Sequence, residues 1–159
     1  MAGDQHRHPV GDRGHRAGRD QGAASQMSAE AFVAAARDFI GVPWVHQGRT
    51  ERGIDCVGLV VLAARAAGID VQATADYGRL QNYMQARHYL EAFCERVGSP
   101  EPGDIVLFKT TQTLHMAIIS EVEDGRPARV IQALGPGSRV VDTGLQFPPL
   151  QLWRPKWPS

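Results

Sequence analysis

Apolar residues recur at helical spacing in the first half of the chain and alternate with polar residues in the second half. Ser28 can cap a helix that runs to about Ile40, and its apolar positions share one face: Phe32, Ala35, Ala36, Phe39 and Ile40. A second helix is predicted over residues 55–67, ending before Gly68. It is apolar on nearly all sides, so we expect it to be central and buried.

The rest of the pattern predicts one more helix and then a sheet. An amphipathic helix is expected over residues 80–97, followed by a turn at residues 99–104 that holds two prolines and a glycine. Strands are predicted over 105–109, 114–122, 129–134 and 139–141, with a candidate edge strand at 150–153. Helices followed by an antiparallel sheet indicate an α+β domain.

Length and composition narrow the class of protein. A chain of 159 residues suits one well-cored domain, which we place at residues 27–159; residues 1–26 are polar and predicted to be disordered. Lys and Arg together number 17, as do Asp and Glu, so no basic surface for nucleic acid is expected. No apolar run approaches the ~20 residues that a membrane-spanning helix needs.

Targeting and metal-binding patterns are equally informative. No signal peptide is visible, so we expect synthesis in the cytoplasm. The two cysteines, Cys56 and Cys94, lack metal-ligand spacing, and the histidines of residues 1–26 are read as chance within a polar tail. The sequence therefore predicts neither a metal nor an organic cofactor.

One cysteine has a position suited to chemistry. Cys56 directly follows Asp55, which can cap the second helix, so its thiol would lie at the positive end of the helix dipole. That location favours the thiolate, the nucleophilic form. The alternative is a small buried apolar residue, which is the usual fate of a free cysteine. Gly58 would permit close approach of a substrate or a neighbouring strand.

A base and an orienting group follow on the predicted strands. His115, Ala117 and Ile119 alternate onto one sheet face, which we expect to meet the central helix and bring the imidazole to Cys56. Gln132, in the middle of the next strand, could accept a bond from the imidazole and so fix its tautomer. The alternatives are a core histidine bonded to backbone and a glutamine on a partly wet strand.

Together these motifs resemble the NlpC-type cysteine peptidases of bacterial cell walls, a compact papain-like family. The matching features are a Gly-x-Pro-aromatic segment at 41–44, Asp-Cys-x-Gly-Leu at 55–59, Pro-Gly-Asp-Ile-Val-Leu-Phe at 102–108, His115 with small and aliphatic followers, and a polar residue before Ala133. The residues at 44–47, Trp-Val-His-Gln, resemble those of the branch of this family that phages carry. The resemblance covers about residues 29–155.

The resemblance implies site residues. It makes Cys56 the nucleophile, His115 the base and Gln132 the third polar member, with the Cys56 backbone N–H as one oxyanion donor. Trp44 stands where the family usually has tyrosine, and His46 is expected to line the groove. We therefore expect Trp44, His46 and Asp55 to bind the substrate or to help form the oxyanion hole.

The resemblance also implies a substrate and a setting. The expected substrate is the peptide stem of peptidoglycan, cut between D-glutamate and the diamino acid, and phage tail proteins are expected partners. Without a signal peptide, a phage particle, host lysis or specialised secretion would bring the enzyme to the wall. Two alternatives stay open: a catalytically silent tail or wall-binding module, and an acyltransferase or amidase on the same fold.

Overall fold

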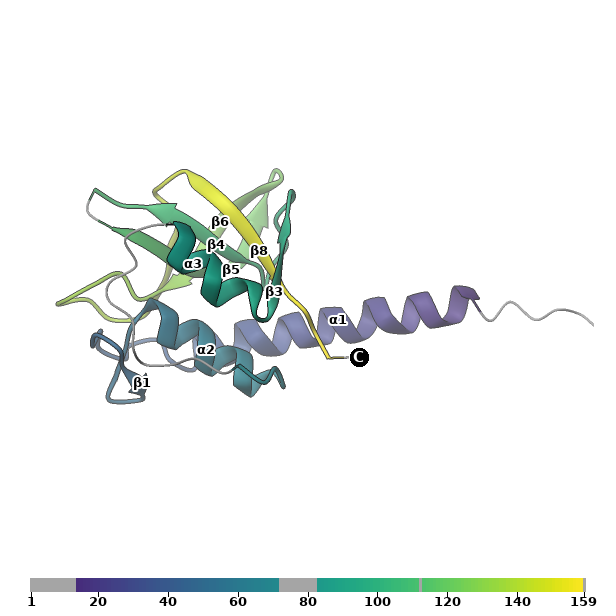
Figure 1. The fold of residues 1–159 in the computed structure, drawn as a ribbon, viewed down its shortest axis with the longest axis horizontal. Helices are drawn as coiled ribbons and strands as arrows, with labels where there is room; N and C mark the ends of the chain where they lie inside the picture. The colour runs from purple at the N-terminus through teal and green to yellow at the C-terminus, as the bar shows by residue number, and fades with distance from the viewer. Residues whose placement is uncertain (1–13, 72–82, 112, 159) are drawn as a thin grey trace, which may run out of the picture.

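The computed structural model describes residues 14–71, 83–111 and 113–158 of the chain. Two helices, α1 (Gly14–Arg37) and α2 (Cys56–Ala66), lie side by side beneath a sheet (Figure 1). A short helix, α3 (Tyr83–Glu91), follows them. The predicted mixture of helices and antiparallel sheet is therefore confirmed. No helix within the described ranges is long and apolar enough to cross a membrane.

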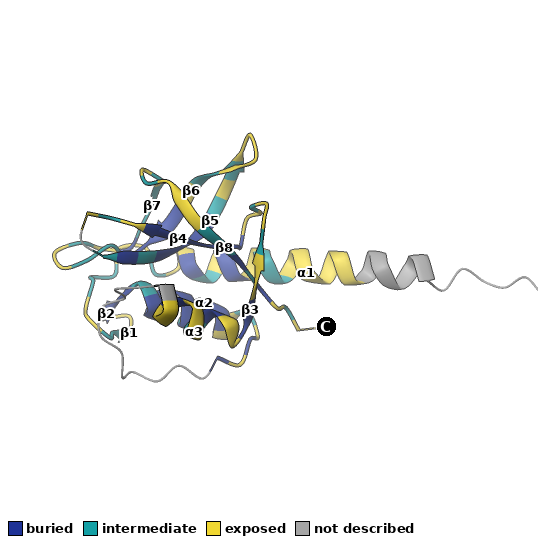
Figure 2. Cartoon of the chain, turned by 45° about the horizontal axis from the view of Figure 1, so that its top comes forward, coloured by how far each residue is buried: buried dark blue, intermediate teal, exposed yellow. Residues whose placement is uncertain are grey.

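α1 differs from its prediction at both ends. It begins at Gly14 rather than at Ser28, so residues 14–26 are helical where disorder was predicted; residues 1–13 lie outside the described part. Residues 21–27 are all exposed, as Figure 2 shows, so helix-forming residues such as Ala23 and Ala24 suffice there without burial. The helix ends at Arg37, and Ile40 is exposed in the following turn.

α2 is the central helix that the pattern predicted. Asp55 caps its first turn by accepting a hydrogen bond from the Gly58 N–H, and Gly68 follows its end with a φ of +90°. Seven of its residues are buried: Val57, Gly58, Leu59, Val60, Val61, Ala63 and Ala64. Because this helix is surrounded by protein, its N-terminal residue Cys56 has a fixed position.

The main sheet has six strands in the order β3-β8-β4-β5-β6-β7, and every neighbouring pair is antiparallel. Its strands are β3 (Cys94–Val97), β4 (Ile105–Lys109), β5 (Leu114–Glu123), β6 (Arg126–Gln132), β7 (Val141–Gly144) and β8 (Pro149–Pro155). A small hairpin of β1 (Arg49–Thr50) and β2 (Gly53–Ile54) precedes α2.

Three predicted elements need correction. Residues 94–97 form a strand and not the end of the third helix, because β8 offers them a hydrogen-bonding partner; residues 80–82 of that prediction lie outside the described part. β8 is not an edge strand, since it lies between β3 and β4. The strand expected at 139–141 begins at Val141, and Arg139 forms only an isolated bridge with Pro43.

The two faces of the sheet belong to different cores. The first core joins α1 and α2 to residues such as Leu114, Met116 and Ile118 of β5. The second core, on the other face, contains Val106, Phe108, Ala117, Ile119 and Val130. Ala117 and Ile119 therefore face away from α2, opposite to the prediction. The predicted alternation of side chains along β5 is correct, but the sequence pattern does not determine which face of the sheet the helices cover.

Candidate active site

A glycine-rich loop packs directly on the start of α2. A side-chain carbon added at Gly58 would lie 2.2 Å from the Gly48 carbonyl oxygen, and one at Gly48 would lie 2.3 Å from the Gly53 carbonyl oxygen. Both contacts are with backbone, which cannot move aside cheaply. The close approach predicted at Gly58 is thus made by the protein's own loop. This packing holds residues 44–54 against the turn that carries Cys56.

Asp55 fastens the same loop by its carboxylate. Its Oδ1 accepts from the Gly58 N–H at 2.7 Å and its Oδ2 accepts from the Gln47 N–H at 2.8 Å. Arg49 adds an ion pair at 3.2 Å, and its guanidinium also donates to the Gly48 carbonyl at 3.0 Å. Asp55 is 3% exposed, so its geometry is that of a cap and clamp for the loop.

Cys56 is the first residue of α2, and its thiol lies against the main chain of β5. Backbone N–H groups of Met116, Val57 and Cys56 itself act on the sulfur and favour its ionised form. Burial opposes them and, together with the Asp55 carboxylate, raises the pKa of Cys56 to about 12. The expected lowering by the helix start is therefore outweighed. The thiol is neutral at pH 7 and needs a base to become a nucleophile.

His115, one residue before Met116, is held by two neighbours. Its Nε2 lies 2.8 Å from the Thr113 hydroxyl. Its ring stacks on Phe108 with centroids 6.0 Å apart, and Phe108 stacks in turn on Phe147 at 5.6 Å. The backbone that the Cys56 sulfur contacts on β5 is that of Met116, the residue next to His115. The His115 ring itself is held on one side by aromatic packing.

Gln132 is buried beside this layer but has another partner. Its Nε2 donates to the Thr143 hydroxyl of β7 at 2.9 Å. Its Oε1 is buried and accepts no hydrogen bond from the part of the chain that the structure describes. The hydroxyl at His115 Nε2 is that of Thr113, which the sequence analysis missed. A two-residue spacing that puts both side chains on one strand face was the available signal.

Trp44 and His46 form a stacked pair next to the loop. Their ring centroids are 6.2 Å apart with an interplanar angle of 26°, and His46 is exposed while Trp44 is partly buried against the first core. The backbone N–H of Trp44 donates to the Ser138 carbonyl at 2.9 Å, which ties the main chain of this segment to the residues before β7. Such a pair offers an apolar face at the surface.

The turn before β4 has a structural role. Asp104 is 1% exposed and pairs with Arg154 of β8 through two contacts of 2.9 Å, while its Oδ2 also accepts from the Glu101 N–H. Burial raises the pKa of Asp104 despite the guanidinium, which lowers it. Gly103 has a φ of +92°, and a side chain there would meet Ala29 of α1. This turn joins the sheet to α1.

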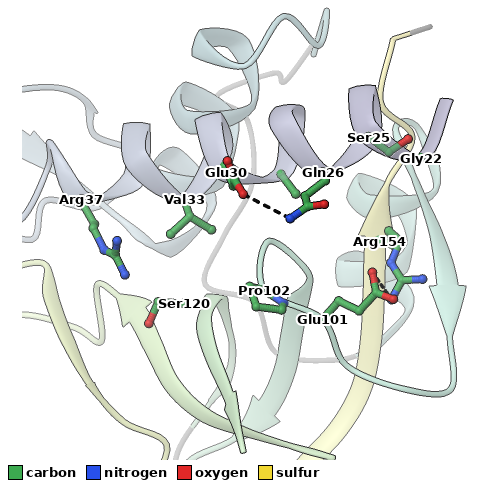
Figure 3. Close-up of a pocket in the computed structure, with 11 residues that line it drawn as sticks. Gly22, Ser25, Gln26, Glu30, Val33, Arg37, Glu101, Pro102, Ser120 and Arg154 are labelled. Atoms are coloured by element: carbon green, nitrogen blue, oxygen red, sulfur yellow. Dashed lines mark hydrogen bonds and ion pairs between the residues drawn. The ribbon is translucent and has the colours of Figure 1, made fainter. Parts of the chain in front are cut away.

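A hollow of about 720 Å³ opens between α1 and that turn. Figure 3 shows Gln26, Glu30 and Arg37 on the helix side and Glu101, Pro102 and Arg154 on the other. None of the residues around it belongs to the Cys56 neighbourhood. Among the described residues, no group of three His, Cys, Asp or Glu side chains could hold a metal ion.

The comparisons with known proteins identify the family and the fold. Residues 41–134, more than half of the chain, match the NlpC/P60 family, so the chain belongs to that family. The comparison with curated proteins gives no match.

Solved structures share the fold. The NlpC/P60 domain of the peptidoglycan hydrolase SagA is 23% identical with a TM-score of 0.53, over 78% of this chain and 96% of that one. The peptidoglycan hydrolase RipB from Mycobacterium tuberculosis is 17% identical with a TM-score of 0.60, over 83% and 66%. A hypothetical invasion protein of the same organism is 17% identical with a TM-score of 0.58, and this chain spans 64% of its length.

Proposed function

We propose that this protein is a cysteine hydrolase of peptidoglycan stem peptides, built in the papain-like arrangement with the nucleophile at the start of the central helix. The observation that carries the proposal is the Cys56 thiol at the first turn of α2, with three backbone N–H groups on its sulfur and His115 one residue from its strand contact. Family membership and the names of SagA and RipB support the wall as the place of action.

The reaction requires His115 as base because the thiol starts neutral. Imidazole takes the proton from sulfur as sulfur attacks the scissile carbonyl carbon, and the carbonyl oxygen becomes an oxyanion near the backbone N–H groups at the start of α2. The C–N bond breaks, and the imidazolium gives its proton to the leaving amine. Water then adds to the thioester with imidazole as base, and the C–S bond breaks to restore the thiol.

The remaining predicted residues have supporting roles in this proposal. Gln132 contributes a buried amide beside the site, whose Nε2 is bonded to the Thr143 hydroxyl. The stacked pair of Trp44 and His46 forms an apolar wall for the stem peptide. Asp55 acts through the loop and the pKa of Cys56 and does not touch the substrate. Cleavage between D-glutamate and the diamino acid, and carriage by a phage tail, complete the proposal.

The decisive experiment compares two alanine variants on purified peptidoglycan. Cys56→Ala is expected to lower hydrolysis by at least about 10⁴-fold, while Cys94→Ala retains it. Mass spectrometry of the products from defined stem peptides gives the scissile bond and separates hydrolysis from acyl transfer. Circular dichroism confirms that both variants are folded. Equal cleavage by Cys56→Ala and the parent would exclude the mechanism.

A second candidate function is a silent module that binds the wall or a tail protein. The raised pKa of Cys56 favours it, because a neutral, crowded thiol is a poor nucleophile without its base. Sedimentation with peptidoglycan in the absence of any released peptide would support this function. Release of peptides that depends on Cys56 would exclude it.

A further inference from the structure

We propose that Thr113 is the positioning residue of His115, and that its hydroxyl, rather than the amide of Gln132, fixes the tautomer of the imidazole. This inference rests on the proposed function of Cys56 and His115. It concerns a residue just before β5 that the recognisable motifs do not include.

The His115 ring has a direct hydrogen-bonding partner. The Thr113 hydroxyl lies 2.8 Å from His115 Nε2, well within bonding distance. A histidine that takes a proton at one nitrogen must carry its own proton on the other. If Nε2–H donates to Thr113, the nitrogen that exchanges a proton with the thiol is Nδ1, which is a buried atom.

Thr113 is itself held in place. Its backbone carbonyl accepts from the Thr110 N–H at 2.9 Å and from the Thr110 hydroxyl at 3.2 Å. Its own N–H donates to the Thr110 hydroxyl at 3.3 Å. All three bonds use the main chain of Thr113, so its side-chain oxygen is left for the imidazole. A positioning group needs this kind of rigid support.

The Gln132 amide does not receive the imidazole N–H. Its Nε2 donates to the Thr143 hydroxyl, and its Oε1 accepts no hydrogen bond from the described residues. Phe108 covers one face of the imidazole, so the ring orientation is set by Phe108 and Thr113 together. We therefore expect the methyl group of Thr113 to matter little and its oxygen to matter for turnover.

The test uses a matched pair of variants in the full chain. Thr113→Val keeps the shape and the main-chain bonds but removes the oxygen, while Thr113→Ser keeps the oxygen. Loss of one hydrogen bond to an imidazolium predicts a kcat that is about ten- to hundredfold lower in Thr113→Val, with KM unchanged. Thr113→Ser is expected to stay within about threefold of the parent, which a purely steric role would not explain.

Nitrogen NMR of histidine-labelled protein reads the tautomer without any substrate. The parent and Thr113→Ser are expected to show His115 protonated at Nε2, and Thr113→Val a mixture of tautomers. Protonation at Nδ1 in the parent, or an unchanged tautomer and kcat in Thr113→Val, would overturn the inference. The inference would also be overturned if kcat fell in Thr143→Val but not in Thr113→Val. Thr143 is the partner of Gln132, so Gln132 would then be the positioning residue.

Failure of the proposed function gives a different result. In that case the parent releases no peptide from peptidoglycan, while the NMR comparison of Thr113→Val with Thr113→Ser still decides whether Thr113 holds the imidazole.

Discussion

Two aspartates of the described residues, Asp55 and Asp104, are buried and make the same kinds of contact. Asp55 accepts two backbone N–H bonds and pairs with Arg49; Asp104 accepts one and pairs with Arg154. Each lies near a cysteine and raises the pKa of its thiol, Asp55 that of Cys56 and Asp104 that of Cys94. What differs is the cysteine's own position.

Cys56 begins a helix, so backbone N–H groups converge on its sulfur, whereas Cys94 lies within β3. Burial raises the pKa of Cys94 strongly, and the opposing influence is the charge of Lys156 rather than backbone N–H groups. An aspartate beside a cysteine is therefore no sign of a reactive thiol. The helix start and the neighbouring histidine distinguish the two sites.

Breaking the Asp104 pair should have the largest effect on stability. Asp104→Ala removes the carboxylate that Arg154 contacts twice, while the guanidinium keeps the Glu101 carboxylate at 3.5 Å and the Ser99 carbonyl at 3.2 Å. Because Arg154 is 28% exposed, we expect a cost of about 3 kcal/mol rather than that of a fully buried pair. Urea denaturation measures the loss. In the double variant Asp104→Ala with Arg154→Met much of it should return. Equal stability of Asp104→Ala and the parent would show that this pair does not hold β4 to β8.

Gly58→Ala tests the corresponding packing beside Cys56. The added carbon would lie 2.2 Å from the Gly48 carbonyl oxygen, so the loop or the first turn of α2 must shift, at a cost of about 1–3 kcal/mol. Hydrolysis should fall with stability, because the moved turn carries the thiol. Gly98→Ala is the matched control, since nothing lies within 4 Å of the added carbon.

The Cys56 and Cys94 thiols should together lower the free energy of unfolding as the pH rises above 9. Both have a pKa raised above 9.0 in the folded protein, so they stay protonated there while the unfolded chain ionises. Above pH 9 the unfolded state therefore binds fewer protons, and stability falls by up to ~1.4 kcal/mol per pH unit for each thiol. Urea denaturation at pH 8, 9 and 10 measures the slope.

The variant lacking both thiols, Cys56→Ala with Cys94→Ala, isolates their share of that slope from other alkaline groups. Its stability should decline less steeply than that of the parent. Identical slopes would mean that neither thiol has a raised pKa.

The smallest effect expected is that of Asp55→Asn on the reactivity of Cys56. Asparagine keeps the cap but removes the charge that raises the thiol pKa, so iodoacetamide labelling at pH 8 should become a few-fold faster. Peptide mapping reads Cys56 and Cys94 separately. Cys94 serves as the internal control, and a parallel acceleration there would point to general loosening rather than to charge.

The sequence predicted the elements that local rules govern. Asp55 as a cap, α2 as the buried helix and β4 over residues 105–109 follow from capping and periodicity. Local rules failed where a distant partner decides: residues 94–97 become a strand only because β8 reaches them, and Ala117 faces the second core because the helices cover the other side.

The candidate site shows the same division. The position of Cys56 at the helix start is local and was predicted, but its pKa depends on everything packed around the sulfur, and burial reversed the expected direction. Thr113 escaped notice because a hydroxyl partner of histidine leaves no distinctive motif. Only the three-dimensional structure shows that the Thr113 hydroxyl lies within bonding distance of His115 Nε2.

The place of β8 in the sheet has a consequence for biosynthesis. Because residues 149–155 are inserted between β3 and β4, the open edge of β4 is covered only after nearly all of the described chain has left the ribosome. Until then the nascent chain carries an unpaired strand and an unfinished core, the state in which chains aggregate most readily. The sheet can therefore be completed only once residues 149–155 have been synthesised.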